Sequence, residues 1–288
     1  MNRRNFLIIV VFLLVISFVF IYFRYGSVRT SADCNTTKRV FILLGQSNMQ
    51  GYGKWLEYPD EMRIKRDDIL IMGNNGWEPL VPNIKNQNGP EISFAHKIKD
   101  VFPNNIIAII KVATGGAGIR AFIPDWKREI AEVSEDVHHG SLYKKLKRQI
   151  DYVKKDPDIV FCGVLWKQGG KDMIKKEYAT GYLKYLKDII TQIRKDTGVS
   201  NLPLFIATYY DIEIAENLYN HSDYYKDREA ALDIIKAHNM AAIEIDNTYV
   251  IHHGNLPVLN DGVHFTTESL IKLGYLFAQE VEGHCNNK

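Results

Sequence analysis

The chain has 288 residues, of which 46% are hydrophobic and 24% are charged, and its formal net charge at pH 7 is +2. This length and composition allow one sizeable core, and we expect a single globular domain. The 36 basic and 34 acidic residues are mixed along the chain, and clusters such as YKKLKRQ lie on predicted helices. The charge pattern therefore argues against nucleic acid as a partner.

The N-terminal segment departs from this average. Every residue from Phe6 to Phe23 is apolar except Ser17, and the run is long enough to cross a bilayer. A cleaved signal peptide usually has a shorter apolar core and a cleavage site of small residues, which the following sequence lacks. The expected segments are an uncleaved signal anchor (1–23), a polar tether (24–38) and a folded domain (39–285).

Cysteines and sequons bear on the compartment of the folded domain. Cys34 and Cys285 flank that domain and are suited to pair in an oxidising compartment, whereas Cys162 lies in an apolar run that indicates a core position. Sequons at Asn35 and Asn220 fit export. Basic residues after the apolar run leave the membrane orientation open. We expect either a membrane-anchored protein whose domain lies outside the cytoplasm or a secreted one.

Short apolar runs alternate with amphipathic runs along the domain. The strand-like runs cover residues 40–44, 106–112, 159–166, 202–208 and 248–251. The helical patterns cover residues 91–102, 141–155, 178–195, 227–244 and 266–282. Apolar runs that do not alternate, each followed by a helix, indicate a parallel sheet buried on both faces. We therefore predict a three-layer α/β/α sandwich with a parallel five-stranded sheet.

Four polar loops follow these strands. Ser47 lies three residues after the first strand, TGGAG (114–118) follows the second, KQGGKD (167–172) follows the third, and NDGVHF (260–265) precedes the last helix. In open α/β sheets, ligands gather beyond the carboxyl ends of the strands. The four loops are therefore expected to meet at one rim.

The residue types in these loops fit ester hydrolysis by a serine. That reaction needs a base for the hydroxyl proton, a group that orients the base, and donors for the developing oxyanion. Ser47 is the candidate nucleophile, His264 the base, and Asp261 the residue that orients it. The candidate oxyanion donors are the backbone amides of Ser47 and of Gly115 or Gly116, with the Gln168 side chain.

Four motifs carry a family resemblance across Arg39 to Glu280. GQSNM, the glycine pair followed by Ile119, LWKQGG and DGVHFT resemble successive blocks of the SGNH hydrolases. The resemblance is to the branch of sialate O-acetylesterases and carbohydrate esterase family six acetylxylan esterases. It implies a flavodoxin-like fold, a serine nucleophile, no metal or other cofactor, and an acetylated carbohydrate as substrate. The third block of that family reads QGE-x-D, whereas this chain has Gly170 at the glutamate position.

Other interpretations of the same residues stay open. Ser47 fits an ordinary turn, Asp261 a cap, the glycine pair a tight turn, and Gln168 a partner for backbone groups. The adjacent histidines at 138–139 and 252–253 lack an accompanying ligand set, so we expect no metal site there. The functional alternatives are an SGNH esterase for another acyl ester, such as a lipid, and a catalytically weak carbohydrate-binding pseudoenzyme, which Gly170 suggests.

Overall fold

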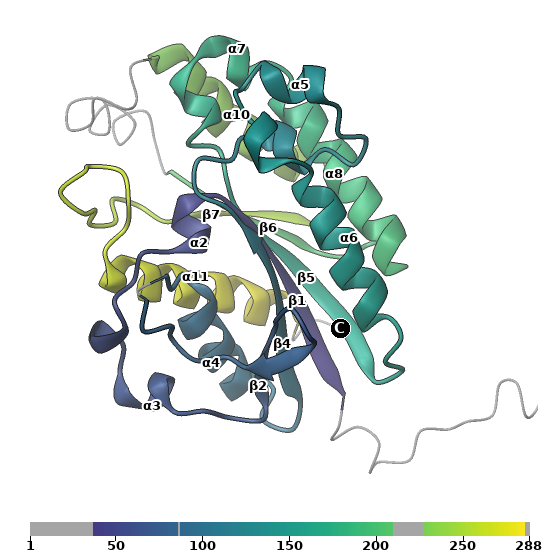
Figure 1. The fold of residues 1–288 in the computed structure, drawn as a ribbon, viewed down its shortest axis with the longest axis vertical. Helices are drawn as coiled ribbons and strands as arrows, with labels where there is room; N and C mark the ends of the chain where they lie inside the picture. Colours follow the sequence, from purple (N-terminus) through teal and green to yellow (C-terminus); the bar gives the residue numbers. More distant parts are fainter. Residues whose placement is uncertain (1–36, 86, 210–226, 286–288) are drawn as a thin grey trace, which may run out of the picture. The chain divides into compact units, whose positions relative to one another are not determined.

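The computed structural model describes residues 37–85, 87–209 and 227–285. Its strands form one seven-stranded sheet in the order β3-β2-β4-β1-β5-β6-β7 (Figure 1). The strands are β1 (Lys38–Gly45), β2 (Ile69–Met72), β3 (Trp77–Pro79), β4 (Ile106–Ala113), β5 (Ile159–Lys167), β6 (Leu204–Thr208) and β7 (Thr248–His252). All neighbouring strands are parallel except β3, which runs antiparallel to β2.

The prediction of a five-stranded parallel sheet is therefore wrong in strand number. The five expected strands are present as β1, β4, β5, β6 and β7, and β2 and β3 extend the sheet beyond β4. Both additional strands are short, with the sequences ILIM and WEP. Runs of that length carry too little periodicity to be recognised in a sequence. The α/β class and the order of alternating strands and helices are as expected.

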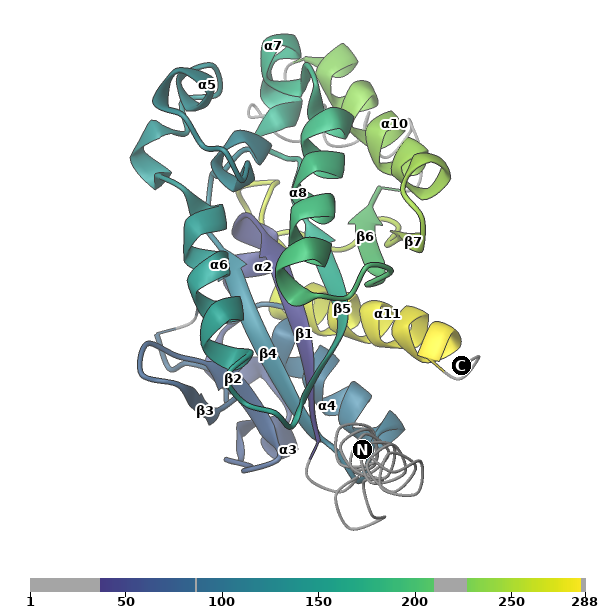
Figure 2. The ribbon, with the colours of Figure 1, turned by 90° about the vertical axis from the view of Figure 1, so that its right-hand side faces the viewer.

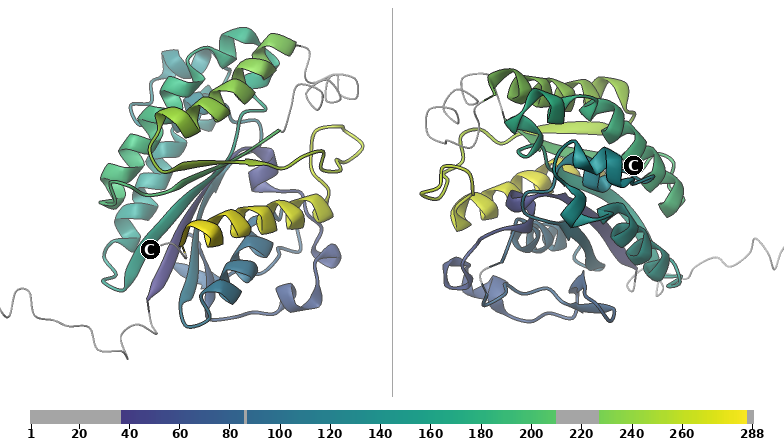
Figure 3. Two further views of the ribbon diagram at one scale, coloured as in Figure 1. Left: turned by 180° about the vertical axis from the view of Figure 1, so that it is seen from behind. Right: turned by 45° about the horizontal axis from the view of Figure 1, so that its top comes forward.

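Helices cover both faces of the sheet. The α-helices of the described residues are α2 (Ser47–Gln50), α3 (Asp60–Arg63), α4 (Glu91–Val101), α5 (Arg128–Glu132), α6 (Leu142–Val153), α7 (Lys176–Ala179), α8 (Tyr182–Thr197), α10 (Arg228–Glu244) and α11 (Thr267–Cys285). Figure 2 shows α6 and α8 in front of the sheet with α4 and α11 behind it. The views in Figure 3 place α10 on the side of α8 and opposite α11. The described residues thus form three layers.

The central strand β1 shows why this sheet is covered on both faces. Val40, Ile42 and Leu44 belong to the core beneath α6, α8 and α10. Phe41 and Leu43 belong to the core beneath α4 and α11. Successive side chains of a strand point to opposite faces, so an uninterrupted apolar run supplies both cores.

Strand register brings the loops together at one rim. Gly45, the last residue of β1, pairs with Ala113 at the end of β4 and with Lys167 at the end of β5. The loops that follow these three strands therefore leave the sheet at the same level. The predicted helix over 178–195 is divided into α7 and α8 at Gly181, which has a φ of +80° that favours glycine.

Several expectations concern residues outside the described ranges. The predicted anchor (1–23), most of the tether, Cys34, Asn35 and Asn220 all fall there. Within residues 37–85, 87–209 and 227–285, none of the helices combines the length and apolarity needed to cross a membrane. The anchor and the Cys34–Cys285 pair stay predictions. Cys162 is only partly buried and packs against the edge of the core beneath α11.

Candidate active site

The serine turn is held between two glycines. Ser47 begins α2 and is only 4% exposed. A Cβ at Gly45 would lie 2.2 Å from the carbonyl oxygen of Lys167, so glycine is needed for β1 to approach β5 this closely. Gly51 has a φ of +88°, and a Cβ there would lie 1.9 Å from the carbonyl oxygen of Asn88. These two glycines fix where Ser47 stands beyond β1.

Asp261 and His264 form a directly bonded pair. The Oδ2 atom of Asp261 lies 2.7 Å from Nδ1 of His264. Its Oδ1 atom accepts the backbone N–H groups of Val263 and His264, both at 2.9 Å. Burial acts to raise the pKa of Asp261, but these hydrogen bonds outweigh it and hold the pKa below its usual value. An imidazole that donates from Nδ1 to a carboxylate keeps Nε2 available as a base.

Asn48 connects the serine turn to the histidine loop. Its Nδ2 atom donates to the carbonyl oxygen of Val263 at 3.1 Å, and its Oδ1 atom accepts the N–H of Phe265 at 2.9 Å. His264 stands between these two residues. In the described part of the chain, no hydrogen bond joins the Ser47 hydroxyl to His264, a contact that often tightens only when substrate binds. Asn48 therefore sets how the two loops face each other.

Replacing Asn48 with alanine is expected to lower kcat by about 10- to 100-fold, because a small misplacement of a catalytic group costs up to that factor. It also leaves a buried N–H and a buried carbonyl without partners, at about 1–3 kcal/mol each. Asn48→Asp retains the acceptor for Phe265 and is expected to fall between alanine and wild type. Steady-state kinetics with melting temperatures on the same preparations test this; equal kcat in all three proteins would contradict it.

The glycine pair after β4 lies beside the serine. A Cβ at Gly115 would stand 3.9 Å from Cβ of Ser47 and 3.3 Å from the hydroxyl of Tyr52. The N–H of Gly115 donates to Oε1 of Gln50 at 2.6 Å. Gly116 has a φ of +73°, and open space faces it. The glycine loop therefore lies next to Ser47, and the Gln50 side chain accepts the N–H of Gly115.

Gln168 is buried, with 3% of its surface exposed. Its Nε2 atom donates to Asp172 Oδ2 at 2.6 Å and also has the carbonyl of Ala117 at 3.1 Å and Oε1 of Gln46 at 3.3 Å. Its own Oε1 accepts the hydroxyl of Tyr182 at 2.8 Å. An amide NH₂ has two protons, and protein acceptors take both in this arrangement. Gln168 would have to exchange a partner before it could donate to an oxyanion.

Several residues around this site were not predicted to belong to it. Asn48 and Gln46 belong to the GQSNM motif, so their presence was visible but their partners were not. The ring of Tyr52 lies 4.4 Å from that of His264, between centroids. Tyr52 is 39% exposed. It therefore covers one side of the imidazole at the surface.

The sequence contains two adjacent histidine pairs, at 138–139 and 252–253. Within the described ranges, no group of three or more His, Cys, Asp or Glu residues is arranged to hold a metal ion. The rings of His138 and His139 lie 3.8 Å apart, and His252 Nε2 lies 3.1 Å from Oδ1 of Asn239.

Comparison with known proteins identifies the family. The profile described as carbohydrate esterase, sialic acid-specific acetylesterase matches residues 37–282. The chain belongs to this family. A curated relative, a probable carbohydrate esterase of Arabidopsis thaliana, is 26% identical over 269 residues, which cover 84% of this chain and 89% of the relative.

Solved structures share the fold of this carbohydrate esterase family member. An Arabidopsis thaliana protein has a TM-score of 0.67 at 20% identity, covering 86% of this chain and 99% of its own. NanS has a TM-score of 0.63 at 16% identity, covering 88% and 98%. A carbohydrate acetylesterase from Xanthomonas citri has a TM-score of 0.56 at 16% identity, covering 87% of this chain and 57% of its own. The resemblance inferred from the four motifs is confirmed.

This family member also buries a lysine beneath its rim. Lys167 Nζ lies 3.1 Å from Nε2 of His253 and over the rings of Tyr209 and Phe265. Burial lowers the pKa of Lys167 to about 7, and burial with the Lys167 charge lowers the pKa of His238 to about 3. Burial and the Lys167 charge also lower the pKa of His253 well below its usual value, so both His238 and His253 are neutral near pH 7.

The burial of Lys167 predicts a stability that rises with pH. Between pH 7 and 10.5 the unfolded chain holds the Lys167 proton while the folded chain releases it, so the free energy of unfolding increases with pH in that window. From pH 7 to pH 9 the gain is on the order of 2 kcal/mol. Lys167→Met is expected to flatten this rise, as measured by urea unfolding at both pH values. Parallel curves for variant and wild type would contradict the buried-lysine assignment.

Proposed function

We propose that this member of the carbohydrate esterase family is a serine esterase that removes O-acetyl groups from a carbohydrate through an acyl-enzyme. The main support for the proposal is the 2.7 Å contact between Asp261 and His264. Asn48 hydrogen-bonds the loop that carries this pair and so connects it to the turn that carries Ser47. A nucleophile, a base and a residue that orients the base are thereby supplied by two loops bonded to each other.

The proposed reaction has two halves. Ser47 Oγ attacks the acetyl carbonyl carbon while its proton passes to Nε2 of His264. The bond between the acyl carbon and the sugar oxygen then breaks, and His264 returns the proton to that oxygen. In the second half, water attacks the acetyl-serine with His264 again taking the proton. Acetate leaves, and the Ser47 hydroxyl is restored.

The proposed oxyanion donors are backbone amides at the meeting of β1 and β4. Among the described residues, no acceptor takes the N–H of Ser47, which favours it as one donor. The N–H of Gly115 is held by Gln50 Oε1 and becomes available when that side chain turns away. A Cβ at Gly116 would meet no atom within 4 Å, and the amide of Gly116 is the proposed alternative to that of Gly115. Gln168 stays a candidate that must first release Asp172, Ala117 or Gln46.

The substrate class follows from the family, and an acetate-release assay tests it. p-Nitrophenyl acetate with a serine-directed inhibitor checks for esterase chemistry. Acetylated xylan, acetylated sialic acid and acetylated peptidoglycan fragments, scored for free acetate, identify the sugar. We expect release from at least one of them, abolished in Ser47→Ala. No hydrolysis of any ester would favour the carbohydrate-binding pseudoenzyme that Gly170 suggests.

A series of p-nitrophenyl esters of increasing chain length separates the acetylesterase from the alternative of a lipid esterase. We expect kcat/KM to be highest for acetate and to fall with longer chains. A maximum at a long acyl chain would favour the lipid alternative.

We further propose that residues 1–23 anchor the protein in a membrane, with the folded domain outside the cytoplasm. The apolar run from Phe6 to Phe23 supports this. Mass spectrometry of the protein from its native host tests it: a mature N-terminus after residue 23 would show cleavage and secretion instead.

A further inference from the structure

Two buried carboxylates approach the backbone at Gly118, just after the glycine pair. Asp136 and Asp172 are both fully buried. The N–H of Gly118 donates to Asp136 Oδ1 at 2.8 Å, and the next N–H, that of Ile119, donates to Asp172 Oδ2 at 3.1 Å. A Cβ at Gly118 would lie 2.5 Å from Asp136 Oδ2 and 3.3 Å from Asp172 Oδ1. The backbone after β4 is thus held between two acids.

Asp172 also holds the loop after β5. Its Oδ2 atom accepts Nε2 of Gln168 at 2.6 Å, and the same Nε2 lies 3.1 Å from the carbonyl of Ala117 in the loop after β4. Tyr182 donates to Oε1 of Gln168 and so fixes the orientation of its amide. One carboxylate therefore joins the two loops that flank the serine turn.

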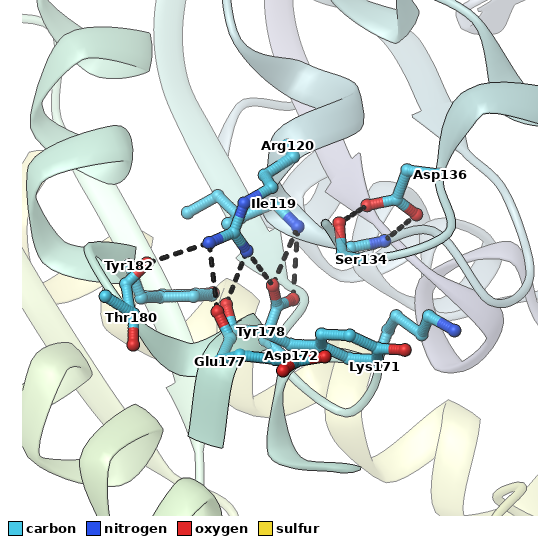
Figure 4. Close-up of polar contacts among 12 residues, drawn as sticks. Ile119, Arg120, Ser134, Asp136, Lys171, Asp172, Glu177, Tyr178, Thr180 and Tyr182 are labelled. Atoms are coloured by element: carbon cyan, nitrogen blue, oxygen red, sulfur yellow. Dashed lines mark hydrogen bonds and ion pairs between the residues drawn. The ribbon is translucent and has the colours of Figure 1, made fainter. Parts of the chain in front are cut away.

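A buried cation stands near this carboxylate. The Nη1 atom of Arg120 lies 3.9 Å from Asp172 Oδ1, and its guanidinium donates to the carbonyls of Glu177, Tyr178 and Thr180 (Figure 4). Despite this cation, burial together with the charge of Asp136 raises the pKa of Asp172 to about 7. Keeping a carboxylate here costs free energy that a neutral side chain of the same shape would avoid.

We propose that Asp172 is a positioning residue for the esterase reaction, which joins the loop after β5 to the loop after β4 and so holds the Gly115 and Gly116 amides beside Ser47. The inference rests on the proposed function. The Oδ2 atom of Asp172 accepts both the Gln168 NH₂ at 2.6 Å and the Ile119 N–H at 3.1 Å, and Oδ1 lies 3.3 Å from the same N–H. Asparagine at this position would place its own NH₂ either at Oδ2, against both donors, or at Oδ1, against the Ile119 N–H.

The test is a double-mutant cycle on kcat. Asp172→Asn and Gln168→Ala are each expected to lower kcat by about 10- to 100-fold with KM nearly unchanged, because loop placement matters most in the transition state. The kcat of the double variant should be only slightly lower than that of the less active single variant, because both substitutions break the same connection. Asp196→Asn is the matched control, because Asp196, at the end of α8, accepts the Tyr143 hydroxyl at 2.7 Å. The kcat of this variant should equal that of wild type.

A second readout does not depend on activity. Hydrogen exchange of the peptide covering residues 114–122 should become faster in Asp172→Asn and stay unchanged in Asp196→Asn. Unchanged exchange, unchanged kcat, or losses that multiply in the double variant would each overturn the proposal. A melting temperature that falls while kcat per folded molecule is retained would assign Asp172 a purely structural role. Wild-type protein that releases no acetate overturns the proposed function, while the exchange experiment still decides whether Asp172 holds the loop.

Discussion

Replacing Ser47 with alanine is expected to reduce kcat on an acetyl ester by about 10⁵- to 10⁶-fold, because no acyl-enzyme can form without the hydroxyl. His264→Ala should cause a loss of similar size, since the hydroxyl is a poor nucleophile while it keeps its proton. The Ser47→Ala/His264→Ala double variant should be scarcely worse than either single variant, because the two residues act as a unit.

Single-turnover and steady-state kinetics, with melting temperatures as the control for folding, measure these losses. Ser47 is buried at the start of α2, but its hydroxyl makes no hydrogen bond to any described residue, so alanine should leave the fold intact. Substantial activity in folded Ser47→Ala would point to a different nucleophile. If the two losses in kcat multiply in the double variant, His264 and Ser47 do not act as a unit.

Asp261→Asn is expected to lower kcat by about 10³- to 10⁴-fold. Asp261 uses Oδ2 for Nδ1 of His264 and Oδ1 for the backbone N–H groups of Val263 and His264. An asparagine can keep only one of these sets, because its NH₂ must face either the imidazole or the backbone. Facing the imidazole, it donates to Nδ1 and moves the ring proton to Nε2, which then cannot accept from Ser47.

The pH dependence of kcat distinguishes this explanation from simple misfolding. A wrong tautomer lowers kcat across the working pH range while the melting temperature stays close to that of wild type. A fall in melting temperature with full kcat per folded molecule would mean that Asp261 serves only to cap the loop. Asp246→Asn is a control, because Asp246 follows α10 at the end away from the rim and its carboxylate lies outside the proposed site.

The central part of the fold could be predicted because it depends on local pattern. The uninterrupted apolar residues of β1 indicate a strand covered on both faces, and their alternation between two cores bears this out. The start of β6 at Leu204 was harder to predict, because the strand-like run in the sequence begins at Leu202. Pro203 has no N–H to donate to the sheet, and only its carbonyl takes part, by accepting the N–H of Val164. Strands β2 and β3 were missed because they are too short to show a period.

The meeting of the candidate site loops could also be predicted, since parallel strands end at one rim. What the sequence did not reveal are the partners that fix those loops. Asn48 bonds to residues more than 200 positions away, and Gln168 bonds to Gln46, Ala117 and Asp172 from three different segments. Such pairings depend on loop conformation rather than on periodicity. Residue type alone suggested Gln168 as an oxyanion donor, which stays a prediction, but it did not reveal these partners.

The measurement that bears most directly on the proposed function is acid quenching of the protein during turnover of a ¹³C-acetylated sugar, followed by peptide mapping. We expect a labelled acetyl group on the peptide containing Ser47, at a level that rises when deacylation is slowed. We expect no label on that peptide in Ser47→Ala. Release of labelled acetate with no acetyl group on Ser47 at any time, or an acetyl group on another residue that remains in Ser47→Ala, would contradict it.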